Sequence, residues 1–152
     1  MELDTIDKSI LTILQANAKL TNAALAQQIN LSPAATLERV KKLEQYKVIT
    51  HYYAQIDYAQ LGLGTAVMVG ITLQKITGTA VKLFQAAIDK IAAITTCYQV
   101  IGVFDFIVMV QTKDILTYQN EVVAKLYMLE EVARMQTLTV TQLLKNKPLR
   151  LT

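Results

Sequence analysis

Apolar residues recur at helical spacing in two short stretches between residues 21 and 46. Spacings of three and four residues place side chains in one stripe of an α-helix, so each stretch predicts a short amphipathic helix. Residues 30–32 separate the stretches, which predicts a tight corner between two helices that share a core. The two stripes are Leu25 with Ile29, and Leu37 with Val40 and Leu43.

The residues at this corner suit a tight turn between helices. Asn30 tolerates the left-handed backbone conformation in which many helices end. Ser32 is a favourable N-cap, and Pro33 fits the first position of the helix that follows. The pattern is typical of a helix-turn-helix, although any α-hairpin in a bundle shows the same two stripes.

The face of the second helix that lies opposite its apolar stripe is polar and basic. Arginine can pair bidentately with guanine, whereas lysine binds phosphate as a point charge. Basic residues on an exposed helix therefore suit contacts with double-stranded DNA, although an ordinary solvated face carries the same charges. The candidate DNA contacts are Ser32, Thr36, Arg39, Lys41 and Lys42.

A further amphipathic pattern, from about residue 4 to 16, predicts a helix before the corner. Asp4 and Asp7 form a capping signal at its start, and the residues expected in the core are Ile6, Ile10, Ile13 and Leu14. Residues 48–56 are rich in β-formers, and residues 61–64 hold the densest glycine patch. We therefore expect a helix-turn-helix domain over 1–49, a connector strand and linker over 50–64, and a second domain over 65–152.

The second domain alternates strand and helix patterns. The expected order is strand, helix, strand, strand, helix, strand over residues 65–75, 78–91, 94–101, 104–112, 115–129 and 135–144. In this βαββαβ arrangement both helices cover one face of an antiparallel sheet, and the other face stays bare. The predicted fold class is α+β, with a three-helix, winged-helix-like N-terminal domain joined by the connector strand to a ferredoxin-like domain.

Composition points to an assembly. The chain is 53% hydrophobic and 18% charged, against about 25% charged residues in typical soluble domains. Such a surplus of apolar surface implies an oligomer, a ligand cavity or a membrane. Residues 91–110 are the best membrane candidate but contain several polar residues, and the N-terminus lacks the layout of a signal peptide. We expect a cytoplasmic homodimer, paired through the bare sheet face, with no membrane partner.

The sequence contains no motif typical of an enzyme. The single Cys97 cannot form an internal disulfide, and the single His51 cannot form a cluster of metal ligands. The sequence has no glycine-rich phosphate loop, nucleophile elbow or paired-carboxylate motif. We expect neither catalysis nor a cofactor or metal. A net charge of +3 permits an anionic partner without requiring one.

Several segments, taken together and in this order, resemble the Lrp/AsnC (feast/famine) family of transcriptional regulators. They are residues 3–19, the corner LSPAATLERVKKLE at 31–44, the connector VITHYYA and the hairpin IGVFDF at 101–106. The resemblance implies cytoplasmic homodimers, often assembled to tetramers or octamers. It also implies DNA binding through the corner, whose second helix (32–45) is the recognition helix, and small effectors, usually amino acids, bound by the ferredoxin-like domain.

The family's effector turn matches Gly102 and Asp105 in this chain. An aspartate could hold an α-ammonium group, and a glycine could let an effector approach the backbone, although Asp105 also suits an ordinary hairpin turn. Thr139 lies in a last-strand stretch that can line the same pocket in the family. The candidate effector-binding residues are Gly102, Asp105 and Thr139.

The chain departs from the family pattern at Lys47, where glycine is common after the recognition helix. A lysine held at positive φ would cost about 1 kcal/mol. Our leading hypothesis is a sequence-specific DNA-binding regulator that responds to an amino acid or a related metabolite. The alternative is a metabolite-sensing oligomer whose helical domain binds a protein instead of DNA, and a small oligomeric enzyme ranks last.

Overall fold

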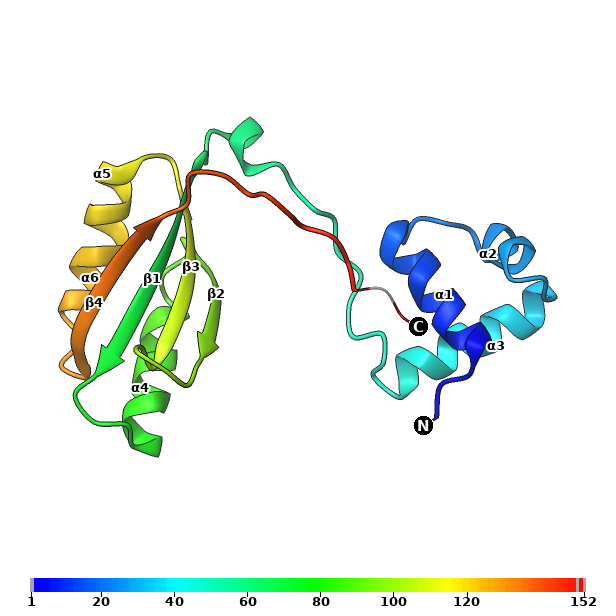
Figure 1. The fold of residues 1–152 in the computed structure, drawn as a ribbon, viewed down its shortest axis with the longest axis horizontal. Coiled ribbons are helices and arrows are strands. Elements are labelled where there is room, and N and C mark those ends of the chain that lie inside the picture. The colour runs from blue at the N-terminus through cyan, green and yellow to red at the C-terminus, as the bar shows by residue number, and fades with distance from the viewer. Residues whose placement is uncertain (1, 150, 152) are drawn as a thin grey trace. The chain divides into compact units, whose positions relative to one another are not determined.

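The structure, a computed structural model, describes every residue except 1, 150 and 152 (Figure 1). The described chain divides into two compact units. The first comprises the residues up to Gln55 together with the C-terminal segment from Lys145. The second comprises Ile56–Leu144.

The first unit contains helices α1 (Thr5–Ala16), α2 (Asn22–Gln28) and α3 (Pro33–Gln45). Their shared core confirms the predicted helix before the corner and the corner itself. Because apolar side chains from all these helices meet there, each helix gains its stability mainly from packing against the others. The core consists of Ile10, Leu25 and Leu43, with Ile6, Ile13, Leu14, Ile29 and Val40 packed against it.

Side-chain caps fix where these helices begin. The carboxylate of Asp4 accepts a hydrogen bond from the backbone of Asp7, and the Asp7 carboxylate accepts one from the backbone of Asp4, which completes the capping box. The Thr21 side chain caps α2 by accepting a hydrogen bond from the N–H of Ala24. Ser32 caps α3, and Pro33 lies in the first turn of that helix. The predicted start of the second helix of the corner is confirmed.

Helices α2 and α3 both end in the backbone arrangement known as the Schellman motif. At the end of α3, the N–H of Val48 donates to the carbonyl of Leu43, and the N–H of Lys47 donates to that of Glu44. The residue in the left-handed position is Lys47, with φ of 58°, and in the equivalent motif after α2 it is Asn30, with φ of 54°. Lys47 therefore adopts the conformation for which a glycine is best suited.

The predicted connector strand is wrong for the described chain. Residues 48–57 are in no strand, and a short 3-10 helix, η1 (Tyr58–Leu61), follows them. A strand requires a neighbouring strand for its backbone hydrogen bonds, and no strand of the described residues pairs with residues 48–57. The high β-propensity of these residues alone cannot supply one.

The second unit is built on strands β1 (Thr65–Leu73), β2 (Ile94–Gln99), β3 (Phe106–Thr112) and β4 (Val132–Thr139). Within the described residues they form a four-stranded antiparallel sheet in the order β2-β3-β1-β4. Helix α4 (Gly78–Ile88) connects β1 to β2 (Figure 1). The predicted βαββαβ topology is confirmed.

The last strand is shifted from its predicted range of 135–144. Strand β4 pairs with β1, with Thr139 opposite Val67, and the N–H of Val140 still bonds to the carbonyl of Ala66. Because β1 begins at Thr65, its pairing partner cannot extend further. The hydrophobic pattern does not reveal where the neighbouring strand stops.

The second helix of this unit contains a wider turn that the sequence did not predict. It consists of α5 (Ile115–Tyr118), a π-helical turn η2 (Gln119–Val123) and α6 (Ala124–Tyr127). Its buried residues, Tyr118, Val122 and Leu126, are spaced four apart, which is more than one turn of a regular α-helix. The wider turn keeps all of them facing the sheet.

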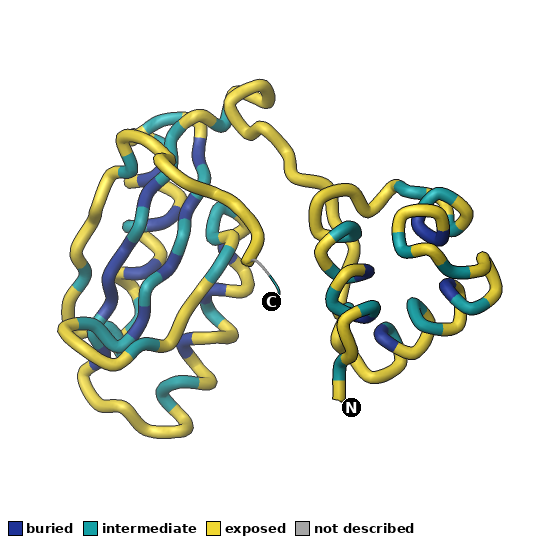
Figure 2. The backbone as a smooth tube through the Cα atoms, turned by 45° about the vertical axis from the view of Figure 1, so that its right-hand side comes forward, coloured by how far each residue is buried: buried dark blue, intermediate teal, exposed yellow. Residues whose placement is uncertain are grey.

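Both helices pack on the same face of the sheet. A single core cluster joins Phe84 and Ile88 of α4, Val122 and Leu126 of the later helix, and alternate strand residues such as Val67, Val69, Val108 and Val110. Figure 2 shows the buried positions concentrated along the central strands. The intervening strand residues point to the opposite face, which no element of this unit covers among the described residues.

Candidate functional site

The exposed face of α3 is set by which of its residues are buried. Thr36 and Leu43 are fully buried, and Val40 packs against the core of the first unit. Leu37, which the sequence placed in the buried stripe, is 43% exposed instead. The inward stripe therefore runs through Thr36, Val40 and Leu43, and the outward face carries Glu38, Lys41, Lys42 and Gln45.

The prediction of Thr36 as a DNA contact is wrong. Its side chain is fully buried, and its hydroxyl donates a hydrogen bond to the carbonyl of Ser32 over 3.0 Å. The sequence placed Leu37 in the inward stripe because of its apolar spacing with Val40 and Leu43, and a buried hydroxyl is costly without a partner. The carbonyl one helical turn earlier supplies that partner, so threonine can occupy the core.

Ser32, Lys41 and Lys42 are exposed, as a DNA contact requires. The Ser32 hydroxyl is engaged as the N-cap, since it accepts a hydrogen bond from the N–H of Ala35. Within the described residues, neither Lys41 nor Lys42 forms an ion pair within 4.0 Å. Their predicted role in DNA binding stays a prediction that the geometry permits.

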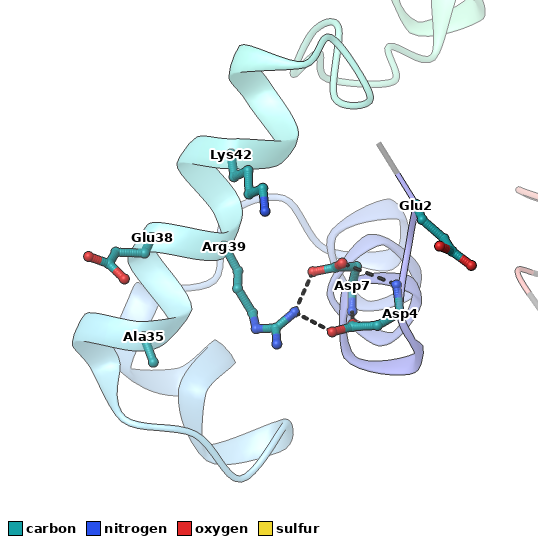
Figure 3. A pocket seen from close by; sticks show the side chains of 7 residues that line it. All are labelled: Glu2, Asp4, Asp7, Ala35, Glu38, Arg39 and Lys42. Atoms are coloured by element: carbon teal, nitrogen blue, oxygen red, sulfur yellow. Dashed lines mark hydrogen bonds and ion pairs between the residues drawn. The ribbon is translucent and has the colours of Figure 1, made fainter.

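Arg39 lies on the flank of α3 that faces the start of α1 (Figure 3). Its Nη1 donates to Oδ2 of Asp4 over 2.7 Å and to Oδ1 of Asp7 over 2.8 Å. The side chain of Asp7 is only 7% exposed, whereas that of Asp4 is 50% exposed. The guanidinium is thus held by two carboxylates of its own unit, one of them nearly buried.

These contacts shift the pKa values of the charged groups. The hydrogen bond from the N–H of Asp7, assisted by Arg39, lowers the pKa of the Asp4 carboxyl. The hydrogen bonds to Asp4 and Asp7 raise the pKa of Arg39 above its ordinary value. Both shifts favour the charged forms of Asp4 and Arg39, so the ion pair between these two residues persists throughout the neutral pH range.

The same residues line a hollow of about 380 Å3 between α1 and α3. Carboxylates of Glu2, Asp4 and Asp7 lie on the α1 side, and Arg39 and Lys42 on the α3 side (Figure 3). Glu38 also lines the hollow, with its carboxylate directed away from the ion pairs of Arg39 (Figure 3). Within the described residues, no group of His, Cys, Asp or Glu side chains is arranged to hold a metal ion.

In the second unit, the turn between β2 and β3 is tied to the end of β1 by Asp105. Its Oδ2 accepts a hydrogen bond from the N–H of Leu73 over 2.8 Å, and its own N–H donates to the carbonyl of Ile71. Gly102 has φ of 154°, a conformation that disfavours side chains. Asp105 therefore has a structural role, and any effector-binding role stays a prediction.

The predicted effector residues do not all converge within one chain. Thr139 pairs with Val67, whereas the N–H of Asp105 bonds to Ile71 on the same strand. A separation of four residues along a strand is about 13 Å, and the two residues flank opposite edges of β1. Gly102 and Asp105 share a turn, but Thr139 lies elsewhere in this unit.

Two important contacts were not predicted from the sequence. The first is the pairing of Arg39 with Asp4 and Asp7, because no local pattern links residues so far apart in the chain. The second is the ring of Phe104 over Gly70, where an added Cβ would lie 2.6 Å from ring atoms. A glycine inside a strand pattern signals such a close approach, so the second contact had a visible cue.

Comparisons with known proteins agree with this architecture. Residues 3–50 match the family model described as winged helix-turn-helix DNA-binding, and residues 66–149 match the Lrp/AsnC ligand binding domain. A Bkd operon transcriptional regulator of Pseudomonas aeruginosa is 36% identical over 118 residues, which are 78% of this chain and 77% of that protein. A leucine-responsive regulatory protein of Haemophilus influenzae is 35% identical over 144 residues, which are 95% of this chain and 87% of that protein.

Solved structures share the fold of the whole described chain. A transcriptional regulator of Neisseria meningitidis, solved in complex with L-methionine, superposes with a TM-score of 0.92 at 26% identity and covers 99% of this chain and 97% of its own. Escherichia coli AsnC superposes with a TM-score of 0.88 at 25% identity and covers 99% of each chain. Among the described residues, no helix is long and apolar enough to cross a membrane.

Proposed function

Since this chain belongs to the Lrp/AsnC family of transcriptional regulators, we propose that it binds double-stranded DNA through the exposed face of α3. The observation that carries the proposal is the division of α3 into two faces. Thr36, Val40 and Leu43 fix the helix to its core, which leaves Lys41 and Lys42 exposed on its outer side. A cytoplasmic location fits such a partner.

The two lysines supply phosphate contacts in this proposal, and Ser32 places the start of α3 against the DNA backbone. Helix N-termini favour anions because their N–H groups and dipole point outward. Each phosphate neutralised by a lysine releases a counterion, so the logarithm of the binding constant falls with the logarithm of salt by about 0.9 per contact. DNA binding by this protein is therefore expected to weaken steeply with salt.

The test uses a duplex selected from randomised DNA by the wild-type protein. Exchanging Lys41→Ala and Lys42→Ala together should reduce the salt slope by about 1.8 for each α3 on the DNA, and so by about 3.6 for a dimer that places two α3 helices there, measured by fluorescence anisotropy between about 50 and 200 mM salt. The matched control is Lys82→Ala with Lys90→Ala, which removes the same charge from exposed positions of the second unit. An equal loss in the control, or no selected DNA at all, would contradict the proposal.

We propose further that the chain forms homodimers through the uncovered face of its sheet, with tetramers or octamers built from them. Met68, Met109 and Leu138 lie side by side on this face, since Met68 pairs with both of the others across the sheet. An apolar sheet face is stable when a second sheet covers it. A two-fold dimer presents two copies of α3, which suits a DNA site with two half-sites.

The second unit is proposed to bind an amino acid near the turn that holds Gly102 and Asp105. Support comes from the ligand-binding domain model that matches this unit and from the relative solved with L-methionine. The test is a thermal-shift screen of the twenty amino acids, in which a ligand that binds the native state raises the melting temperature. The hit should lose its effect in Asp105→Asn, and an unchanged shift in that variant would move the site away from this turn.

A further inference from the structure

Arg39 has both of its contacts inside the first unit. Its Nη1 lies 2.7 Å from Oδ2 of Asp4 and 2.8 Å from Oδ1 of Asp7, so one nitrogen joins two carboxylates (Figure 3). Arg39 lies near the middle of α3, and the two aspartates lie at the start of α1. The three side chains, which we call the Arg39 clamp, therefore connect the recognition helix to a different helix.

The burial of Asp7 makes this connection hard to break. Its side chain is 7% exposed, and a carboxylate that is nearly removed from water needs a paired cation. Turning the guanidinium of Arg39 toward a DNA phosphate would leave that carboxylate with its backbone partner alone. The internal pairing therefore competes directly with any contact between Arg39 and DNA.

The aspartates are themselves held in fixed positions. Each accepts a hydrogen bond from the backbone N–H of the other in the capping box, at 2.8 Å and 3.2 Å. Their oxygens thus form a rigid receptor for the guanidinium at the first turn of α1. Elsewhere these two helices meet through the apolar core around Ile10 and Leu43, so the clamp is a polar contact beside an apolar one.

We propose that Arg39 is a positioning residue, which sets the orientation of α3 for DNA binding through the clamp and does not contact DNA itself. The proposal rests on α3 as the DNA-binding helix. It reverses the role that the sequence predicts for Arg39, which is a direct base or phosphate contact. It also gives Asp4 and Asp7 a part in DNA binding, although carboxylates beside DNA ordinarily oppose it.

The two roles predict opposite signs for the same substitution. If Arg39 contacts DNA, Asp4→Asn removes a competing negative charge and DNA affinity rises. If Arg39 acts through the clamp, Asp4→Asn loosens α3 and DNA affinity falls. Asparagine is as good an N-cap as aspartate, so the start of α1 is preserved and only the charge is lost.

The experiment measures affinity for the selected duplex across the salt series in the full-length protein. We expect Asp4→Asn and Arg39→Gln each to weaken binding by about three- to tenfold, with the salt slope unchanged. Their combination should weaken it less than the product of the single effects, because both break the same clamp. Circular dichroism melting curves show whether each variant is folded at the assay temperature. If Arg39→Gln is unfolded there, Asp4→Asn alone still tests the clamp, because Asp4 is half-exposed and its substitution disturbs the core less.

The matched comparison is the Lys41→Ala and Lys42→Ala double variant, which should lower the salt slope. If this variant weakens binding but Asp4→Asn strengthens it or leaves it unchanged, the clamp is overturned and the DNA interface stands. A fall in the salt slope of Arg39→Gln by about 0.9 for each α3 on the DNA would likewise overturn the clamp. If the lysine variant binds like wild type, the proposed interface on α3 fails, and the clamp proposal fails with it.

Discussion

Two single residues in this chain, Lys47 and Gly70, show how the surrounding structure sets local geometry. Lys47 holds φ of 58° at the end of α3, where the Schellman hydrogen bonds require a left-handed residue. At Gly70 the constraint is space: only a residue without a side chain leaves room for the ring of Phe104. In both cases the neighbouring structure, and not the residue's own preference, decides the local geometry.

Replacing Lys47→Gly should raise the free energy of unfolding by about 0.5–1 kcal/mol. Glycine removes the steric cost of the left-handed conformation, although it also increases the entropy of the unfolded chain. The measurement is urea denaturation followed by circular dichroism. Lys41→Gly is the control, since a glycine inside α3 should lower stability by about 1 kcal/mol. A destabilising Lys47→Gly would show that the lysine makes compensating contacts.

Replacing Gly70→Ala should lower the free energy of unfolding by about 1–3 kcal/mol, because the new Cβ would lie 2.6 Å from the Phe104 ring. In a Phe104→Ala background the same change should cost much less. Gly64→Ala is the matched control, since a Cβ there meets nothing within 4 Å. Equal losses at both glycines, measured by urea denaturation, would argue against the ring contact as the cause.

At the scale of elements, three aspartates that cap a helix or sit in a turn also bind a neighbouring element. Asp4 and Asp7 cap α1, and the same carboxylates bind Arg39 of α3. Asp105 sits in the turn after β2, and its carboxylate holds the last N–H of β1. Residues that appear in the sequence as ordinary caps and turns therefore also set how neighbouring elements are placed.

Acid should loosen the link between α1 and α3. The pKa of the Asp4 carboxyl is lowered in the folded state, so its stabilising contribution is complete above its unfolded pKa of about 4 and is lost as the pH falls below that value. We expect the melting temperature of wild type to fall more steeply between about pH 5 and pH 2 than that of Asp4→Asn. Parallel pH profiles for the two proteins would exclude a contribution from this carboxyl.

At the scale of the whole molecule, helices fill one face of the sheet, and the other face carries Met68, Met109 and Leu138 side by side. Met68→Lys places a charge in the middle of the second face, between Met109 and Leu138. We expect this variant to sediment as a monomer in analytical ultracentrifugation and to bind DNA more weakly, since a monomer offers one α3 instead of two. Leu83→Lys, at an exposed position of α4, should keep the wild-type mass. A dimeric Met68→Lys variant would refute pairing through this face.

The sequence by itself determined the family and the order of the helices and the sheet strands, though not the state of the connector or the bounds of the last strand. Periodicity located the corner, the capping residues gave its helix starts, and the alternation of strands and helices gave the βαββαβ topology, because these signals are local in the chain. Basic residues on the outer side of α3 likewise followed from helix geometry. Lys47 was singled out by its departure from a glycine pattern, and the structure shows it at positive φ.

Only the tertiary structure decided which of those residues face inward and what they contact. Thr36 is buried and Leu37 exposed, because the carbonyl of Ser32 satisfies the threonine hydroxyl and so shifts the buried stripe by one residue. Arg39 looks like a DNA contact in the sequence, yet it binds two carboxylates more than thirty residues away. Such pairings depend on the path of the chain in space, which short-range patterns do not encode.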